Sequence, residues 1–370
     1  MSEIKTEPTS SGRGAALGSS RNSDPRPLVT LVLPAYNEAA VLRDNVAEIE
    51  RHIAALAQRF RWEVLIINDG SRDQTAAIAE ALRGEFANIR VIHHARNGGL
   101  GRAFRTAFEH CCGDYVVTLD IDLSYSPDHI EALLEVLIAT HADLVLASPY
   151  MKGGRLTRVP WLRKILSISA NRFLSLFSHG NLSTLTCMVR GYRGDFVRSL
   201  ILRSTSMDIM PEVVYKSMIL RGRIEQVPAH LDWSRQVAVG VKRRSSMRIL
   251  RQVFATLLAG FILRPFMFFI VPGLVLLVFA LYTNAWMIVH FVEAWNALGD
   301  VPGSKASAAV AQAYALYPHT FIVGLLSLML SIQLVSLGIL ALQNKAYFEE
   351  IFHLGTALKT RIDSGMERRN

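Results

Sequence analysis

Two long uncharged segments in the last third of the chain constrain its fold more than any other feature. They run from Phe266 to Val289 and from Phe321 to Leu342, and each is long enough to cross a bilayer core of about 30 Å as a helix. With 51% apolar residues, the 370-residue chain is also more hydrophobic than an ordinary soluble domain. We therefore predict two transmembrane helices. The alternative for each segment is a helix buried in a soluble core.

Lys and Arg residues near these segments predict their orientation. Between the two segments, residues 290–319 contain only one such cation, Lys305. Because cytoplasmic loops are enriched in Lys and Arg, we expect an integral membrane protein with both termini and the amino-terminal region in the cytoplasm. The cations that support this orientation precede the first segment or follow the second: Lys242, Arg243, Arg244, Arg248, Arg251, Arg264, Lys345, Lys359 and Arg361.

The remaining patterns divide the chain into five parts. Residues 1–27 are polar and rich in Ser and Gly, without the apolar core of a signal peptide, so they are predicted to be a disordered leader. Residues 246–264 carry apolar side chains at helical spacing opposite basic ones. This pattern predicts a helix in the membrane interface or, alternatively, an amphipathic helix packed on a soluble domain. The other parts are a cytoplasmic domain at 28–245, a transmembrane hairpin at 265–343 and a cytoplasmic tail at 344–370.

Short apolar segments, often β-branched, alternate with helical patterns in residues 28–245. The clearest helix follows Pro127, where one apolar stripe consists of Ile130, Leu133, Leu134, Leu137 and Ile138. Such alternation predicts an α/β fold, a mainly parallel sheet flanked by helices, with ligands beyond the carboxyl ends of the strands. The predicted strands are Leu28–Pro34, Trp62–Asn68, Ile89–His94, Tyr115–Asp120 and Asp143–Ser148.

Polar side chains follow the first two predicted strands. Asn37 and Glu38 come after the first strand, and Asp69 comes after the second. Because the carboxyl ends of parallel strands meet at one edge of a sheet, these side chains are expected to converge there. The alternative for Asp69-Gly70-Ser71 is a turn that caps the following helix.

A glycine-rich segment with several cations, residues 96–105, precedes a predicted helix. Glycine lets the main chain approach an anion closely, and the amino terminus of a helix favours negative charge. The segment therefore predicts a phosphate site. A dinucleotide-binding loop is the competing interpretation, but the glycine spacing differs from that fingerprint and the segment does not follow the first strand.

Asp120 and Asp122 end the fourth predicted strand, with Ile121 pointing the opposite way. Two carboxylates on one side of the chain are hard oxygen ligands that suit Mg²⁺ or Mn²⁺. Such a cation would neutralise a departing diphosphate. The alternative is that the pair caps a helix.

Taken together, four segments resemble the nucleotide-sugar site of the family 2 glycosyltransferases, which have a GT-A-type fold. They are Pro34-Ala35-Tyr36-Asn37-Glu38, Asn68-Asp69-Gly70-Ser71, Arg96-Asn97-Gly98-Gly99-Leu100-Gly101-Arg102 and Asp120-Ile121-Asp122. Downstream, residues 186–193 resemble a segment that reads Thr-Ser-Gly-Phe-Arg in relatives of dolichol-phosphate mannosyltransferase, and Arg190 falls on its arginine. The resemblance covers about residues 28–245.

The resemblance implies a role for each matching residue. Ser124 stands where a Gln often completes the metal shell, so the metal ligands would be Asp120, Asp122 and Ser124. The catalytic residues would be Asp122 and Arg190. The acceptor phosphate would contact Arg190, Arg193, Arg243 and Arg244, unless these arginines form a solvated basic face. The donor would be bound by Pro34, Tyr36, Asn37, Glu38, Asp69, Asn97, Gly98, Gly101, Arg102 and Asp120.

These features predict an inverting, metal-dependent glycosyltransferase that moves a hexose-like sugar from a nucleotide-diphosphate donor to undecaprenyl or dolichyl phosphate at the cytoplasmic membrane face. Expected partners are the donor, the polyprenyl phosphate, the membrane and further copies of the chain, but no nucleic acid. In the alternative, the acceptor is a hydroxyl group of a glycan or glycerolipid, and Asp208 acts as the general base. A third interpretation is a membrane scaffold that lacks turnover.

Overall fold

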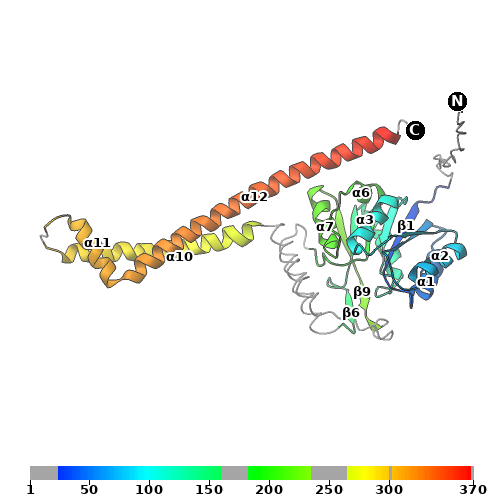
Figure 1. Ribbon diagram of the computed structural model, residues 1–370, viewed down its shortest axis with the longest axis horizontal. Helices are drawn as coiled ribbons and strands as arrows, with labels where there is room; N and C mark the ends of the chain where they lie inside the picture. The colour runs from blue at the N-terminus through cyan, green and yellow to red at the C-terminus, as the bar shows by residue number, and fades with distance from the viewer. Residues whose placement is uncertain (1–23, 160–181, 235–264, 300–301, 368–370) are drawn as a thin grey trace, which may run out of the picture.

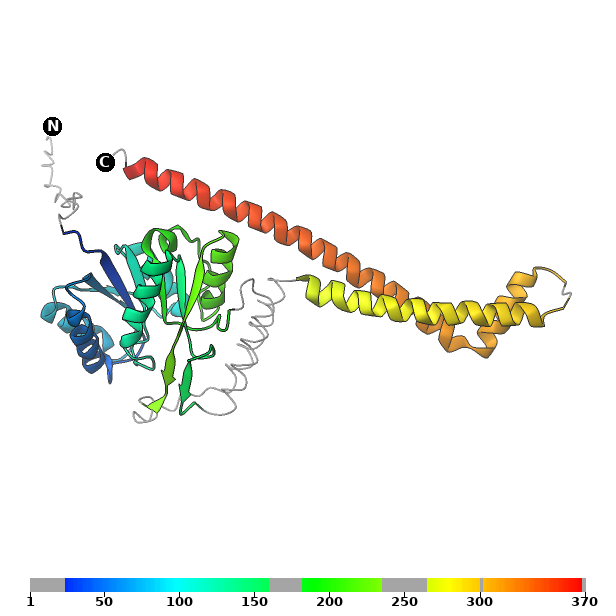
Figure 2. The ribbon, with the colours of Figure 1, turned by 180° about the vertical axis from the view of Figure 1, so that it is seen from behind.

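The computed structural model describes residues 24–159, 182–234, 265–299 and 302–367 (Figure 1). These residues form an α/β domain and a long helical hairpin that extends away from it, as the two opposite views show (Figures 1 and 2). The predicted interfacial helix at 246–264 lies outside the described residues, as do Arg243 and Arg244 and most of the predicted leader.

A seven-stranded sheet forms the centre of the α/β domain, in the order β3-β2-β1-β4-β7-β5-β8. All neighbouring strands are parallel except β7, which runs antiparallel to both β4 and β5. The predicted mainly parallel sheet is therefore confirmed, although the sequence revealed neither β7 nor β8. The strands are β1 Leu28–Ala35, β2 Arg61–Asn68, β3 Ile89–His93, β4 Tyr115–Thr118, β5 Leu144–Ser148, β7 Arg190–Arg193 and β8 Ile224–Pro228.

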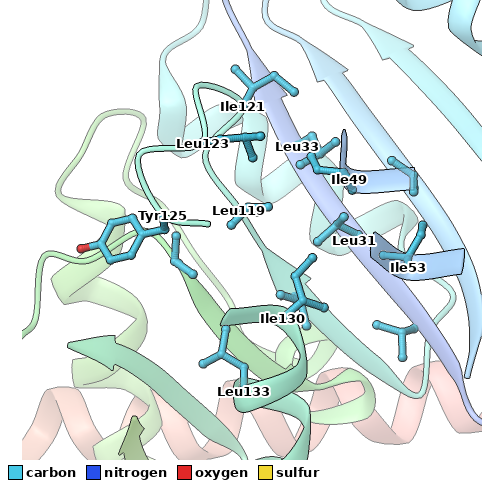
Figure 3. Close-up of a cluster of buried hydrophobic side chains, with 14 of the residues drawn as sticks. Leu31, Leu33, Ile49, Ile53, Leu119, Ile121, Leu123, Tyr125, Ile130 and Leu133 are labelled. Atoms are coloured by element: carbon cyan, nitrogen blue, oxygen red, sulfur yellow. The ribbon is translucent and has the colours of Figure 1, made fainter. Parts of the chain in front are cut away.

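Helices cover both faces of this sheet and bury a separate apolar core on each. Leu31 and Leu33 of β1 point into the first core, whereas Val32 points into the second, because successive side chains of a strand alternate between faces. Figure 3 shows the first core, between β1 and two helices. Helices α1 Leu42–Ala55, α2 Thr75–Glu85 and α4 Asp128–Thr140 pack on the first face, and α3 Leu100–His110, α6 Gly194–Ser199 and α7 Ile209–Ile219 pack on the second.

Helix α4 confirms the apolar stripe predicted after Pro127. Ile130, Leu133 and Leu134 are fully buried, so the stripe faces the core as its spacing indicates. Ile138 is the exception, because 36% of this residue is exposed near the end of the helix.

A small second sheet lies beside the end of β4. It pairs β6, Arg155–Thr157, with β9, His230–Asp232, in parallel. The main-chain N–H of Asp232 donates to the carbonyl of Ser124 at 2.9 Å, so this small sheet supports the loop that follows β4.

The hairpin consists of α10 Pro265–Ala297, α11 Lys305–Leu316 and α12 Pro318–Glu367. Only 11% of the most apolar part of α10, and 17% of that of α12, is buried within the protein. A core helix of a soluble domain would be mostly buried, so both are candidate membrane-spanning helices. The connection between the two spans contains α11, and α12 continues past the predicted second span into the segment that was predicted to be the tail.

Close contacts hold α10 and α12 together. The side-chain amide of Asn284 donates to the carbonyl of Gly324 at 3.0 Å, and Ser331 donates to the carbonyl of Gly273 at 2.9 Å. A Cβ atom at Gly338 would overlap Ile270, so glycine is needed where the helices approach. Small residues and interhelical hydrogen bonds are typical of helix pairs in membranes.

Candidate active site

Four loops meet where the parallel strands β1 to β4 end, because these strands are neighbours in the sheet and run in the same direction. We call this region the carboxyl rim and define it by residues 34–38, 68–71, 94–102 and 120–124. It contains all four segments on which the resemblance rests. Ligands of open parallel sheets bind at such an edge.

Asn37 links the first two loops of the rim. Its side-chain oxygen accepts the main-chain N–H of Arg72 at 2.9 Å, and its own N–H donates to the Ser71 hydroxyl at 3.0 Å. The residue has φ +56°, a left-handed conformation that Asn tolerates better than most residues. Pro34 is buried before this turn, and Tyr36 is 40% exposed. Tyr36 is therefore the large side chain of this loop that a ligand can reach.

Asp69 lies beneath the glycine-rich loop and is only 4% exposed. One carboxylate oxygen accepts the N–H of Gly98 at 2.9 Å, and the other accepts the N–H of Gly99 at 2.8 Å. His94 also contacts this carboxylate, with 2.7 Å between Nδ1 and Oδ1, while its Nε2 lies 2.9 Å from the Thr106 hydroxyl. Asp69 therefore holds the loop in place, and this conformation leaves it little surface for a nucleotide base.

The glycines of this loop allow a close approach by the chain itself. Gly99 has φ +86°, and a Cβ atom on it would overlap the carbonyl oxygen of Thr205. A Cβ atom on Gly101 would likewise overlap the carbonyl of Ser204, and the Gly101 N–H donates to the Thr205 carbonyl at 3.0 Å. The sequence predicted close approach to an anion, whereas the structure shows in addition that residues 204–205 pack directly on the loop.

Arg102 provides positive charge at the same loop. Its side chain folds back over Gly98, where a Cβ atom would overlap it, and the residue remains partly exposed. Arg102 also lies in the first turn of α3, where the helix dipole favours an anion. The loop can therefore receive phosphate groups. Asn97 is exposed beside it, with its side-chain amide 3.4 Å from the Asp69 carbonyl.

The acidic pair follows β4 in a loop with alternating burial. Leu119, Ile121, Leu123 and Tyr125 are all buried in the first core, as Figure 3 shows, although the strand ends at Thr118. The alternate positions contain Asp120, Asp122 and Ser124, of which the two aspartates are partly exposed and Ser124 is buried.

Local hydrogen bonds shape this acidic loop. Asp122 Oδ1 accepts the Ser124 N–H at 3.0 Å, and the Asn45 amide of α1 donates to the Ile121 carbonyl at 2.7 Å. Leu123 adopts φ +49°, an unusual conformation for a branched apolar residue. The pair therefore lies on a tightly held turn, which is the kind of support that a site of defined geometry requires.

The buried hydroxyl of Tyr125 and the buried thiol of Cys187 lie close to Asp120. Burial raises the pKa of Tyr125 well above its usual value, and the negative charge of Asp120 raises it further. Burial likewise raises the pKa of the Cys187 thiol to about 11, so this group stays protonated near neutral pH. Tyr125 and Cys187 are therefore neutral neighbours of the acidic pair.

The residues present fit a divalent cation that also binds phosphate. Mg²⁺ and Mn²⁺ need few protein carboxylates when phosphate oxygens complete their shell, and Asp120 and Asp122 supply two. Among the described residues, no group of three or more His, Cys, Asp and Glu side chains could hold a metal by itself. This donor set suits a cation that arrives with a diphosphate.

Arg190, which was predicted to contact the acceptor phosphate, does not lie on the exposed surface of the rim. It is fully buried, and its guanidinium donates to the carbonyls of Cys187, Met210 and Leu185 at 2.7, 2.8 and 2.8 Å. These bonds join the segment before β7 to α7. Arg190 is therefore a structural residue.

Arg193, the second arginine predicted to contact the acceptor phosphate, lies at the other end of the sheet from the carboxyl rim. In the antiparallel register, Arg193 pairs with Tyr115 at the start of β4, whereas Arg190 pairs with Thr118 near its end. Its guanidinium forms ion pairs with Asp143 and Asp195, both at 2.7 Å. The other two residues of the predicted acceptor set, Arg243 and Arg244, lie outside the described residues.

Asp208 occupies the N-cap position of α7, yet its side chain forms no capping hydrogen bond. The residue is exposed and follows the segment 204–205 that packs on the glycine loop. The side chain of Asp208 therefore does not cap this helix.

Several residues that support the loops of the rim were not predicted from the sequence. Each of them contacts another part of the chain. His94 contacts Asp69, and Asn45 donates to the Ile121 carbonyl. Glu212 accepts the N–H groups of residues 203 and 204. The one available signal was the position of His94, a polar residue directly after an apolar strand. Such a residue ends next to the rim, but its partner could not be read from the pattern.

Comparison with known proteins adds independent information. Residues 30–201 match the model of the family described as "Glycosyl transferase family 2". The matched residues, which include all four loops of the rim, are therefore similar to a family 2 glycosyltransferase domain.

Two curated relatives are named as polyprenyl-phosphate mannosyltransferases. The dolichol-phosphate mannosyltransferase of Pyrococcus furiosus is 32% identical over 142 residues, which span 38% of this chain and only 39% of that protein. The undecaprenyl-phosphate mannosyltransferase of Micrococcus luteus is 27% identical over 206 residues, 54% of this chain and 82% of that protein. Among solved structures, glucosyl-3-phosphoglycerate synthase of Mycobacterium tuberculosis matches 63% of this chain and 79% of its own, with 23% identity and a TM-score of 0.46.

Proposed function

We propose that this protein transfers a hexose-like sugar from a nucleotide-diphosphate donor to a polyprenyl phosphate, with inversion at the anomeric carbon, on the cytoplasmic face of a membrane. The observation that carries the proposal is the convergence of four loops at one rim, in a chain that also has two candidate membrane-spanning helices. The names of the two curated relatives favour a polyprenyl phosphate as the acceptor.

In this proposal, the donor lies across the rim from β2 to β4. Tyr36, Asn37 and Glu38 face the nucleoside, and Asp69 orients the loop that receives the diphosphate. Arg102, at the amino terminus of α3, binds the diphosphate oxygens. Asp120 and Asp122, with Ser124 behind them, hold Mg²⁺ or Mn²⁺. The cation supplies charge neutralisation for the leaving diphosphate.

The acceptor phosphate needs no protein base. Its second pKa is about 6, so it is largely dianionic near neutral pH and can attack the anomeric carbon directly. The residues of the rim therefore contribute orientation and charge stabilisation, the terms that dominate such reactions. Arg243 and Arg244 are the cations that we assign to the acceptor, because they precede the first span.

A hydroxyl acceptor is the second candidate, and one observation favours it. Asp208 is exposed without a capping bond, so its carboxylate is available to remove a proton. Replacing Asp208 with Asn distinguishes the two acceptors. Near-normal transfer by this variant supports the phosphate acceptor, whereas near-complete loss with intact donor binding supports the hydroxyl.

The proposed function is tested with the full-length protein in lipid nanodiscs. Labelled GDP-sugars and UDP-sugars are offered with undecaprenyl or dolichyl phosphate and Mn²⁺, and the lipid product is extracted. We expect one donor to give a lipid-linked sugar that disappears in Asp122→Asn. The matched control is Asp44→Asn, an exposed carboxylate in the first turn of α1, which is expected to transfer normally. Unchanged product in Asp122→Asn would remove the assigned metal site.

A further inference from the structure

The C-terminal part of α12 packs against the α/β domain on the side of α7. We call residues 346–358 the C-terminal extension, because they follow the predicted second span. Phe348 stacks on Tyr215 of α7, with 6.4 Å between ring centroids and an interplanar angle of 6°. The ring of Phe352 covers Lys216, whose Nζ lies 5.2 Å from the ring centroid. Figures 1 and 2 both show α12 passing beside α7.

Lys216 is a buried cation with defined partners. Its residue is 5% exposed, and its Nζ donates to Glu212 Oε1 at 2.5 Å and to the carbonyl of Ile201. Phe352 is only 8% exposed, and it helps to exclude water from this ammonium group. A cation against an aromatic face is attracted by it, and more strongly when water is excluded.

Glu212 connects Lys216 to the main chain that precedes α7. Its carboxylate accepts the N–H groups of Arg203 and Ser204 at 2.9 and 2.8 Å. Burial by itself would raise the pKa of Glu212, but the bonds from Lys216, Ser204 and Arg203 outweigh it, so the pKa is lowered. The charged carboxylate is therefore the form that holds residues 203–204.

Residues 204–205 in turn contact the glycine loop of the rim. The Thr205 carbonyl accepts the Gly101 N–H, and the chain lies so close that neither Gly99 nor Gly101 can carry a Cβ atom without overlap. A continuous set of contacts thus leads from Phe352 through Lys216 and Glu212 to the loop that receives the diphosphate.

We propose that the C-terminal extension supports the donor site, with Phe352 and Lys216 as positioning residues that hold residues 201–205 against the glycine loop. The proposal rests on the proposed function in one respect, since it takes the glycine loop as a donor contact. When the extension is undocked, the glycine loop adopts its donor-binding conformation for only a fraction of the time. The apparent dissociation constant then rises by the inverse of that fraction.

The mechanical part of the proposal is tested by hydrogen exchange on the full-length protein in nanodiscs. Phe352→Ala is compared with Ile351→Ala, a neighbouring residue on the same helix that is 68% exposed. We expect Phe352→Ala to speed amide exchange about tenfold in residues 98–105 and 201–206, a change of about 1.4 kcal/mol, with β2 unchanged. Ile351→Ala is expected to exchange like the parent protein.

Donor kinetics test the functional part. Phe352→Ala is expected to raise the donor KM about tenfold while kcat changes less than threefold, because the reacting groups are untouched. Phe352→Tyr is expected to restore the parent KM, since it keeps an aromatic face over Lys216. Lys216→Met is expected to resemble Phe352→Ala, and the two together are expected to add little, because both break one set of contacts.

The outcomes separate this inference from the proposed function. Equal exchange at residues 98–105 in Phe352→Ala and Ile351→Ala overturns the inference, whether or not the enzyme is active. An equal donor KM in the two variants overturns it as well. If the parent protein binds no nucleotide sugar at all, the proposed function fails, while the exchange experiment still decides whether the extension holds the loop.

Discussion

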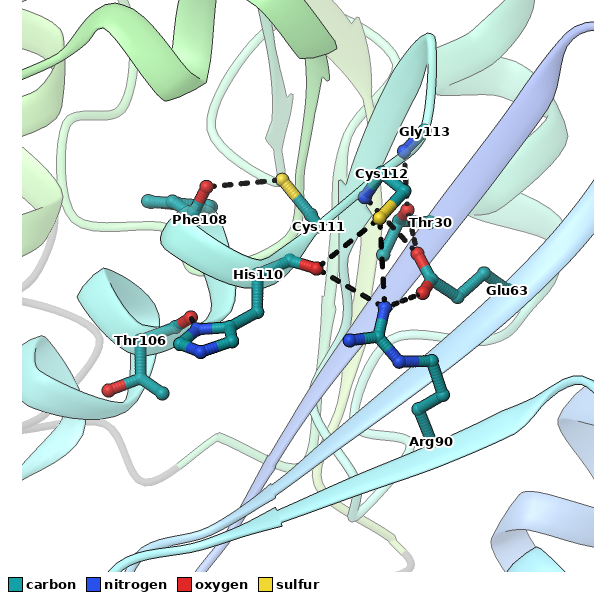
Figure 4. A network of polar contacts seen from close by, with 9 residues as sticks. All are labelled: Thr30, Glu63, Arg90, Thr106, Phe108, His110, Cys111, Cys112 and Gly113. Carbon is teal, nitrogen blue, oxygen red and sulfur yellow. Dashed lines mark hydrogen bonds and ion pairs between the residues drawn. The ribbon is translucent and has the colours of Figure 1, made fainter. Parts of the chain in front are cut away.

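The two ends of the parallel sheet both bury a carboxylate, but they use it differently. At the amino-terminal end, Glu63 accepts the Thr30 hydroxyl at 2.6 Å, pairs with Arg90 and accepts the Cys112 N–H at 3.3 Å (Figure 4). At the carboxyl rim, Asp69 accepts two N–H groups from a glycine loop. The first arrangement closes the connection between α3 and β4, and the second presents a loop to solvent.

Backbone conformation sharpens this contrast. Asn37, Gly70, Gly99 and Leu123 all have positive φ values, and all lie in loops of the rim. At the opposite end, His141 occupies a left-handed position as the C-cap of α4, which is an ordinary way to end a helix. Unusual conformations away from helix ends tend to accumulate at functional sites. The rim therefore has the backbone features of a binding site, whereas the Glu63 network stabilises the fold.

The largest effect that tests this comparison is expected from Asp122→Asn. Loss of a carboxylate that neutralises the leaving diphosphate should lower the transfer rate about 10³-fold, about 4 kcal/mol in the barrier. The melting temperature should stay near that of the parent protein, because Asp122 is partly exposed. Transfer assays and thermal unfolding of the same preparation give both values. A large drop in stability instead would assign Asp122 to structure.

Gly99→Ala is expected to have the next largest effect. The new methyl group would overlap the Thr205 carbonyl at a position with φ +86°, so the loop must shift. We predict a donor KM raised about 10-fold to 100-fold, equal to about 1.4–2.8 kcal/mol. Gly84→Ala is the matched control, because Gly84 lies in α2 with nothing within 4 Å of a Cβ atom. It should stabilise the protein slightly and leave the KM unchanged.

Glu63→Gln is expected to lower stability without changing donor binding, the opposite of what we expect for Asp122→Asn. The amide weakens the bonds to Arg90, Thr30 and the Cys112 N–H, which is expected to cost about 1.5 kcal/mol of unfolding free energy. The donor KM of the folded protein should match the parent, because the network lies at the far end of the sheet. Chemical denaturation measures the loss, and a raised donor KM would show that the two ends are coupled.

The smallest effect concerns the pH dependence of stability. The pKa of Glu212 is lowered in the folded protein, so its stabilisation is present above the ordinary value of 4.5 and is lost as the pH falls through the folded-state pKa. The difference in melting temperature between the parent and Glu212→Gln should therefore be largest near pH 7 and shrink below about pH 4.5. A difference that grows on acidification would contradict the lowered pKa.

The sequence predicted the parallel part of the sheet well, because β1, β2 and β5 are buried on both faces and appear as continuous apolar runs. It missed β7, since Arg-Gly-Tyr-Arg carries no strand pattern and depends on its neighbours for pairing. The predicted motifs lie at one rim because their strands are parallel neighbours.

The roles of individual residues were harder to predict. Arg190 looked like a phosphate ligand, yet it is fully buried against three carbonyls, and no local pattern distinguishes these cases. The position of Arg193 at the far end of the sheet follows only from the antiparallel register of β7, which the sequence did not reveal. The supporting contacts of His94, Glu212 and Lys216 join segments far apart in sequence, so a single chain without its fold does not reveal them.

The most direct test of the central claim is calorimetric titration of the full-length protein in nanodiscs with GDP and UDP, with and without Mn²⁺. The account predicts that one nucleotide binds, that Mn²⁺ strengthens its binding at least tenfold, and that Asp122→Asn abolishes this gain while Glu63→Gln preserves it. Binding that is equally strong without Mn²⁺ and in Asp122→Asn would contradict the claim that the acidic pair and a cation hold the donor diphosphate at the carboxyl rim.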